Sequence, residues 1–164
     1  MFSLMREHFV SGMKKICDRG VRLKVIGDKS LLPSDVVELI EKAEKDSERY
    51  EGKGVNVALA YGARAELVRA ATLAAAAGVP VSEESLSSFL YTGGQPEVDL
   101  IIRTGKEKRL SNFLLYQAAY AELYFSDKMF PEFSDEDLDE AIADFSSRKR
   151  RYGKTDEQCE GENL

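Results

Sequence analysis

The residues best suited to chemistry in this chain lie between Asp99 and Phe113. This segment starts as a short apolar run, breaks at Gly105 and then becomes dense in charge. Within seven positions it carries four basic side chains, which are Arg103, Lys106, Lys108 and Arg109. Ser111 follows with a hydroxyl group, and arginine forks with a hydroxyl can share the oxygens of a diphosphate. The alternative is a solvated loop whose arginines pair with Glu107 and Asp99, and no Walker motif or GxGxxG accompanies the loop.

Two further features could support a site. Glu122 stands in an apolar stretch, and a carboxylate buried there would need a partner such as magnesium or an arginine. The alternative is an edge residue that faces water. The segment Tyr61-Gly62-Ala63-Arg64 falls at an expected strand-to-helix turn, where small residues let backbone N–H groups approach an anion. Taken by itself, this segment is equally compatible with a tight turn and an exposed arginine.

The composition limits the class of protein. With 164 residues, of which 43% are hydrophobic and 32% charged, the chain is typical of one soluble globular domain. Its formal net charge of -6 argues against general nucleic-acid binding, which needs a broad basic face. Cys17 and Cys159 show no zinc-ligand spacing. We expect no signal peptide and no membrane-spanning stretch, so the predicted location is the cytoplasm.

Hydrophobic periodicity predicts strands that alternate with helices, and hence an α/β fold: a single domain with a mainly parallel sheet flanked by helices. The expected strands are 21–26, 55–61, 98–103 and 122–125. The expected helices are 2–18, 35–49, 65–77, 82–90, 111–119 and a last helix that Ser134 caps and that ends at 148–151. Ser34 is expected to cap the helix at 35–49. The nearly continuous apolar character of 55–61 predicts a parallel strand buried on both faces.

At these same residues the chain resembles the cis-prenyltransferases, the undecaprenyl diphosphate synthase family. Residues 99–125 read DLIIRTGKEKRLSNFLLYQAAYAELYF, close to the family block D-L-[VI]-I-R-T-[SG]-G-E-x-R-[LI]-S-N-F-[LM]-L-W-Q-x-x-Y-[AS]-E-[LF]-Y-F. The segments VRLKVIGD, NVALAYGAR, MFPEF and RKRRYG resemble further family segments in the same order. The resemblance implies a cis-prenyltransferase-like domain over 1–153 and leaves 154–164 as a tail that we expect to be disordered.

The resemblance also implies an activity, namely head-to-tail condensation of isopentenyl diphosphate onto an allylic diphosphate to make Z double bonds. It assigns substrate binding to Arg103, Arg109, Leu110, Ser111 and Arg64. Among these, both arginines of the basic loop and Ser111 match residues that hold the diphosphate of isopentenyl diphosphate. Glu122 matches a residue that helps to hold Mg2+, in that family through the site of the partner subunit. Such groups suit the chemistry, since ionisation of an allylic diphosphate needs its leaving charge neutralised.

The sequence also departs from the family pattern. The family opens with a strand and a D-G-N-x-R loop, which supplies a magnesium-binding aspartate and cradles the allylic diphosphate. No such loop occurs in this sequence. We therefore expect a chain that keeps the isopentenyl-diphosphate half of the site and lacks the allylic half, with no certain catalytic residue. Four positions also differ from the family motifs, and these are Ala60, Ala63, Lys106 and Tyr116.

Together these inferences predict a prenyltransferase-family protein that binds isopentenyl diphosphate for chain elongation and is incomplete without a partner or the N-terminal segment. One alternative is a non-catalytic accessory subunit that dimerises with a full-length homologue. Another is a fragment that results from a misplaced start codon. Open sheet edges predict an oligomer, either a homodimer or a heterodimer with a full-length relative. A lipid product would add peripheral association with a membrane.

Overall fold

The computed structural model describes Gly12, Lys15, Ile16 and residues 18–148. The chain divides into two compact units, Met1–Gly94 and Gln95–Leu164, termed here the N-terminal and C-terminal units. Most of the helix expected over 2–18, the end of the last helix and the tail at 154–164 lie outside the described residues.

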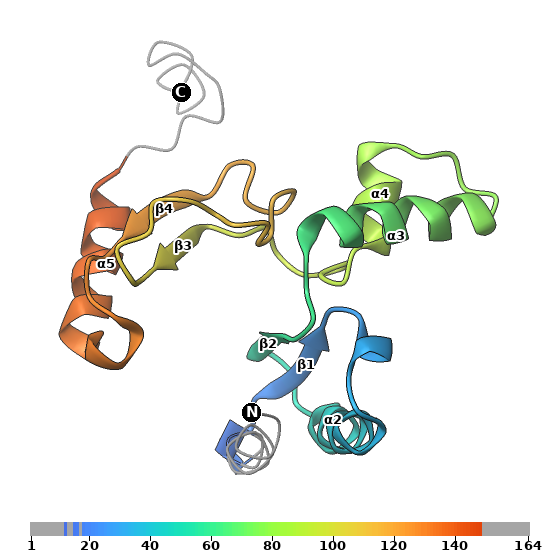
Figure 1. Cartoon of the computed structure of the whole chain (residues 1–164), viewed down its shortest axis with the longest axis horizontal. Helices are drawn as coiled ribbons and strands as arrows, with labels where there is room; N and C mark the ends of the chain where they lie inside the picture. Colours follow the sequence, from blue (N-terminus) through green and yellow to red (C-terminus); the bar gives the residue numbers. More distant parts are fainter. Residues whose placement is uncertain (1–11, 13–14, 17, 149–164) are drawn as a thin grey trace, which may run out of the picture. The chain divides into compact units, whose positions relative to one another are not determined.

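The N-terminal unit is built on a two-stranded parallel sheet, labelled β1 and β2 in Figure 1. β1 (Arg22–Ile26) pairs in parallel with β2 (Gly54–Ala58). The connection between them contains a short 3-10 helix, η1 (Lys29–Leu31), and the helix α2 (Ser34–Ser47), which packs against β1. The core residues buried here are Leu23, Val25, Ile26 and Ile40.

Side chains of α2 close the edge of β1 that faces away from β2. The hydroxyl oxygen of Ser47 accepts the backbone N–H of Leu23 at 3.0 Å, and Glu44 Oε1 accepts the N–H of Val25 at 2.7 Å. Lys29 Nζ lies 2.7 Å from the other oxygen of Glu44. A parallel strand leaves every second N–H on its outer edge, and buried backbone donors need partners. The outer N–H groups of β1 are therefore satisfied without a further strand.

The carboxyl ends of β1 and β2 approach each other closely. Gly27 has φ +128°, and a Cβ atom at this position would lie only 1.9 Å from the carbonyl oxygen of Leu59. Glycine is therefore the residue that this contact requires. Ala60, just beyond β2, has φ +48°, which is a left-handed conformation that an alanine adopts at a cost. The turn that starts at Tyr61 is thus fixed against the end of the sheet.

Two helices follow this turn and pack against each other. α3 (Ala63–Ala76) is rich in alanine, the best helix former, and its buried positions include the small residues Ala70 and Ala74. α4 (Glu83–Phe89) begins at Ser82, whose hydroxyl oxygen accepts the N–H of Ser85 at 3.1 Å. The cap expected at Ser82 and both helices are therefore confirmed, with boundaries shifted by a few residues.

The C-terminal unit contains the second parallel pair, β3 (Leu100–Arg103) and β4 (Glu122–Phe125). A short 3-10 helix, η2 (Phe130–Glu132), leads into α5 (Asp135–Ser147), which packs against β4. Ser134 caps α5 as expected, and it forms a capping box with Asp137. Acidic residues in the first turn of α5 complement the positive end of the helix dipole.

The α/β class and the parallel pairing are confirmed, but four expectations differ from the structure. The described strands form two pairs instead of one sheet. The helix expected over 111–119 is wrong, because positive φ angles interrupt it and the segment forms successive turns. Ser34 is the first residue of α2 and not its cap, which is Pro33. The strand expected to be buried on both faces is mostly exposed, because β2 has β1 as its one paired neighbour among the described residues.

Candidate anion-binding site

The basic loop after β3 is held by main-chain hydrogen bonds to the segment after β4. The N–H of Gly105 donates to the carbonyl oxygen of Lys128 at 2.7 Å, and the N–H of Lys106 donates to that of Ser126 at 3.2 Å. Gly105 has φ +90° and Lys106 has φ +65°, so the chain reverses here through two left-handed residues. The loop therefore has a defined conformation although Lys106, Lys108 and Arg109 are exposed.

Arg103 closes this loop on itself. Its Nη1 donates to the hydroxyl oxygen of Ser111 at 2.9 Å and also to the carbonyl oxygen of Arg109. Both bonds use Nη1, so within the described part of the chain the Nε and Nη2 donors of the guanidinium remain available to a ligand. The structure thus brings together Arg103, Arg109 and Ser111, the three residues that the sequence assigns to diphosphate, with Leu110 between them.

The position of Arg109 is compatible both with an anion-binding loop and with a solvated loop whose arginines pair with acidic residues. Its side chain is 63% exposed and pairs with the carboxylate of Glu107. This pair was the alternative interpretation of the loop, and it is present. An exposed ion pair contributes little to stability, so an anion with more charge can replace Glu107 at small cost. The loop still carries more basic than acidic side chains between residues 103 and 109.

Backbone strain concentrates at the same place. Among the described residues, five other than glycine have positive φ: Ala60, Lys106, Ser111, Asn112 and Leu114. Four of these lie in the segment 106–114, directly after β3. A left-handed conformation costs a residue other than glycine or asparagine on the order of 1–3 kcal/mol, which here applies to Lys106, Ser111 and Leu114, and strain of this kind clusters at functional sites. The observation favours a binding loop over a solvated connection.

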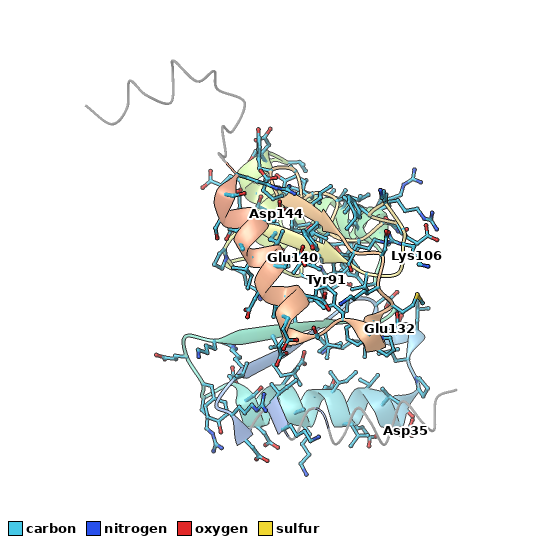
Figure 2. All side chains as sticks on the ribbon, turned by 90° about the vertical axis from the view of Figure 1, so that its left-hand side faces the viewer. Asp35, Tyr91, Lys106, Glu132, Glu140 and Asp144 are labelled. Carbon is cyan, nitrogen blue, oxygen red and sulfur yellow. The ribbon has the colours of Figure 1, made fainter. Side chains whose placement is uncertain are left out.

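Many acidic residues of the C-terminal unit lie on α5 and not in the basic loop. Figure 2 shows Glu140 and Asp144 one turn apart on that helix, with Lys106 well separated from both in this view. Near the start of α5, Lys128 Nζ lies 2.7 Å from Asp137 Oδ1, and the N–H of Ser134 donates to Oδ2 at 2.8 Å. These two hydrogen bonds lower the pKa of the Asp137 carboxyl to about 2. Among the described residues, no ion pair joins a basic side chain of the loop to α5.

Glu122, the predicted magnesium ligand, lies at the other end of the strand pair. It opens β4 opposite Leu100, whereas Arg103 lies opposite Phe125 at the far end. Its carboxylate accepts from Arg148 Nη1 at 2.8 Å, so an arginine supplies the partner that the sequence required. The hydrogen bond to Glu122, followed by that to Asp144, raises the pKa of Arg148. No cluster of three metal-ligating side chains occurs in the part of the chain that the structure describes.

Arg64 belongs to the N-terminal unit, where it is exposed on the first turn of α3. Near it lies a residue that sequence reasoning missed. Glu66 is 2% exposed, accepts the N–H of Tyr91 at 2.7 Å and accepts the hydroxyl of Tyr61. Arg69 stacks on the Tyr91 ring, with 4.2 Å between its Cζ atom and the ring centroid. A carboxylate in an alanine-rich helix looks like a surface residue, so only the structure identifies Glu66 as buried.

Comparison with known proteins decides the family. Residues 1–153 match the sequence profile of the family described as putative undecaprenyl diphosphate synthase. The chain belongs to the undecaprenyl diphosphate synthase family. An isoprenyl transferase of Treponema denticola is 43% identical over 154 residues, a match that covers 93% of this chain and 68% of that protein. A tritrans,polycis-undecaprenyl-diphosphate synthase of Pyrococcus horikoshii, described as geranylgeranyl-diphosphate specific, is 44% identical over 148 residues, covering 86% and 56%.

Two solved structures share the fold of this chain. A probable undecaprenyl diphosphate synthase from Campylobacter jejuni superposes with a TM-score of 0.85 at 38% identity, covering 93% of this chain and 73% of that one. Lavandulyl diphosphate synthase from Lavandula x intermedia, solved with dimethylallyl diphosphate, gives 0.85 at 35% identity and covers 92% and 70%. The sequence-based assignment to this family is confirmed. Among the described residues, no helix is long and apolar enough to cross a membrane.

Proposed function

We propose that the chain binds the diphosphate of isopentenyl diphosphate at Arg103, Arg109 and Ser111 and serves in Z-type prenyl chain elongation. The observation that carries this proposal is the fixed guanidinium of Arg103, which is bonded to Ser111 and still has donors to offer. Charge-assisted, bidentate bonds from arginine suit diphosphate oxygens. Membership of the undecaprenyl diphosphate synthase family supports the choice of a prenyl diphosphate among possible anions.

In this reaction the C–O bond of an allylic diphosphate breaks, a C–C bond to isopentenyl diphosphate forms, and a proton leaves the isopentenyl unit. The residues of this chain would hold the diphosphate of the acceptor in place. Positioning of one reactant converts a bimolecular encounter into an intramolecular step, which lowers the barrier substantially. The donor half of the site, in this proposal, comes from a partner or from a further segment.

Glu122 is the residue of this chain that we propose as a ligand of Mg2+. A single carboxylate with diphosphate oxygens and water is an ordinary set of Mg2+ ligands, so Glu122 fits as one ligand of the ion. The bound ion would neutralise charge on a diphosphate. Because Glu122 and Arg103 lie at opposite ends of the strand pair, we infer that Glu122 serves the site of a second subunit in a dimer. A long prenyl product would also bring the protein into contact with a membrane surface.

Isothermal titration of isopentenyl diphosphate tests the binding site. We expect Arg103→Ala and Arg109→Ala to weaken binding by about tenfold to a hundredfold, as the loss of a hydrogen bond between charged groups predicts. Lys108→Ala is the matched control, because Lys108 is an exposed basic residue of the same loop outside the proposed ligand set. Equal losses in all three variants would show that the loop attracts anions only through its net charge.

The accessory-subunit alternative predicts a different result in an activity assay. A prenyl-transfer assay with labelled isopentenyl diphosphate, farnesyl diphosphate and Mg2+ separates the two functions. Robust elongation by the purified chain alone would reject the half-site proposal. If elongation appears only with a full-length homologue, Arg103→Ala decides between the alternatives. If this chain binds substrate, the variant abolishes the elongation activity that appears when the chain and the homologue are mixed. If the chain is purely accessory, the variant leaves that activity unchanged.

A further inference from the structure

Lys106 has a backbone conformation that a lysine adopts only at a cost. Its φ is +65°, in the left-handed region that glycine tolerates freely and other residues rarely adopt. Gly105, directly before it, has φ +90° without such a cost. A glycine at position 106 would therefore make the same turn with less strain. The stability of the turn does not account for a lysine at this position.

Main-chain hydrogen bonds bring the backbone of Lys106 to that of Arg103. The N–H of Ser126 donates to the carbonyl oxygen of Arg103 at 2.8 Å, and the carbonyl oxygen of Ser126 accepts the N–H of Lys106 at 3.2 Å. Both basic residues are thus bonded to the main-chain groups of one and the same residue. Since Arg103 belongs to the proposed diphosphate site, Lys106 is held next to that site by the backbone itself.

The ammonium group of Lys106 is available to a ligand. The residue is exposed, and within the described ranges no ion pair involves its side chain. Its acidic neighbour in sequence, Glu107, pairs with Arg109 instead. Asp127 lies in the segment that bonds the loop, and among the described residues it forms no ion pair with Lys106 either. The lysine therefore adds a positive charge to the loop that the protein itself does not neutralise.

We propose that Lys106 is a further substrate-binding residue, which binds one phosphate group of the diphosphate while Arg103 and Ser111 hold the other. An ammonium group is a compact charge on a flexible stem, so it can reach a phosphate that lies outside the fixed arginine fork. Two cationic groups held side by side favour a ligand with two phosphate groups over a ligand with one. The proposal rests on the proposed function, since it extends the same site, and it makes Lys106 the residue that selects diphosphates over monophosphates.

Isothermal titration of the full chain with isopentenyl diphosphate and with isopentenyl monophosphate, both without divalent metal, tests this role. Lys106→Gln removes the charge and keeps the strained turn. We expect it to weaken binding of the diphosphate by about tenfold and binding of the monophosphate by less than about twofold. Lys108→Gln is the matched control, because Lys108 is an exposed lysine of the same loop whose φ is not positive. It should change neither affinity by more than about twofold.

Lys106→Gly separates binding from stability. It removes the charge together with the strain at φ +65°, so it should bind the diphosphate about tenfold more weakly while its midpoint of urea denaturation rises. Lys108→Gly should lower that midpoint, because glycine there only adds freedom to the unfolded chain. A higher midpoint of Lys106→Gly with unchanged preference for the diphosphate would overturn the proposal.

Equal losses for both ligands in Lys106→Gln, or equal losses in Lys106→Gln and Lys108→Gln, would also reject this role, since only the net charge of the loop would then matter. Arg103→Ala reports on the proposed function separately, because it should weaken binding of both ligands. If it binds them as the original chain does, the proposed function fails. If Arg103→Ala weakens binding and Lys106→Gln does not, only the role of Lys106 is rejected. Absence of binding to the original chain would reject both.

Discussion

The N-terminal and C-terminal units both satisfy outward backbone groups of a strand with side chains, but one unit uses acceptors and the other uses a donor. Each contains two parallel strands, and in each a side chain from the adjoining helical segment covers part of one outer edge. In the N-terminal unit, the acceptors Ser47 and Glu44 satisfy N–H groups of β1. In the C-terminal unit, the donor Arg148 bonds the carbonyl oxygen of Leu123 in β4 at 3.3 Å. Ser47 is fully buried, whereas Arg148 is exposed.

This difference separates a scaffold from a binding surface. Buried polar groups in the N-terminal unit have no access to water, so removal of one partner leaves the other unsatisfied. The exposed pairs of the C-terminal unit can exchange protein partners for water or a ligand with little change in free energy. We therefore expect substitutions to affect mainly stability in the first unit and mainly binding in the second.

The largest loss of stability is expected from Gly27→Ala. The new Cβ atom would lie 1.9 Å from the carbonyl oxygen of Leu59, in addition to the strain of φ +128°. We expect the free energy of unfolding to fall by about 3 kcal/mol or more, measured by urea denaturation. Gly78→Ala is the control, since Gly78 has φ +68° with nothing within 4 Å of its Cβ position. Similar losses in both variants would mean that the close approach of the strand ends contributes nothing.

Glu66→Ala should have the next largest effect. It removes the carboxylate that accepts the part-buried N–H of Tyr91 and the hydroxyl of Tyr61, which should cost about 2 kcal/mol of unfolding free energy. Glu66→Gln keeps one acceptor oxygen and should lose about half as much. Chemical denaturation of the two variants measures the difference. If both retain the stability of the original chain, Glu66 does not hold the turn that carries Arg64.

Substitutions of Ser47 and Arg148, which bond the outer edges of β1 and β4, allow the two units to be compared by their loss of stability. Ser47→Ala should lower the unfolding free energy by about 1–2 kcal/mol, because the N–H of Leu23 loses its buried partner. Arg148→Ala should cost less, since water replaces the exposed guanidinium. Ser146→Ala, at an exposed position of α5, controls for the change of a helical serine. A greater loss for Arg148→Ala than for Ser47→Ala would reverse the contrast between the units.

A smaller effect of opposite sign is expected at Ala60. Its φ of +48° is costly for alanine, whereas asparagine and glycine tolerate this conformation. Ala60→Asn and Ala60→Gly should therefore raise the unfolding free energy by up to about 1 kcal/mol. Thermal denaturation gives the sign. Ala76→Gly, within α3, provides the control and should destabilise; a loss of stability at both positions would show that φ at residue 60 is not strained.

The smallest expected effect is a dependence on pH at α5. The pKa of Asp137 is lowered from 3.8 to about 2, so its ionised form stabilises the folded state above pH 3.8 and this contribution disappears as the pH falls through 2. Asp137→Asn should be less stable than the original chain near neutral pH, and the two should converge near pH 2. Asp139→Asn on the same helix is the control. Parallel pH profiles for the original chain and Asp137→Asn would contradict the assignment.

Much of this architecture could be predicted from local sequence. Apolar periodicity identifies β1, α2 and α5, and the caps at Ser82 and Ser134 follow from residue type alone. The basic loop could also be predicted as a unit, because its residues are close in sequence. The partner of Glu122 could not be predicted from the sequence, because Arg148 is 26 residues away and only the packing of α5 on β4 brings the two side chains together.

Two failures have a shared physical cause. The segment after Arg109 has helical periodicity, but the φ angles of Ser111, Asn112 and Leu114 are positive, and only the asparagine is of a type that favours this conformation. For β2, apolar composition predicts burial, but burial depends on neighbours that lie elsewhere in the sequence or outside the described residues. In both cases tertiary context overrides the local preference, and the first departure lies in the loop to which we assign binding.

The bond between Arg103 and Ser111 has a thermodynamic consequence for ligand recognition. A free arginine side chain loses on the order of 1.5–2 kcal/mol of rotamer entropy when it is immobilised. The Arg103 side chain has already lost this entropy in the folded protein, because Ser111 and the carbonyl oxygen of Arg109 hold its guanidinium. Preorganisation of this kind raises affinity without any added contact. Removal of the Ser111 hydroxyl should therefore appear as a less favourable binding entropy, although every charge in the loop is kept.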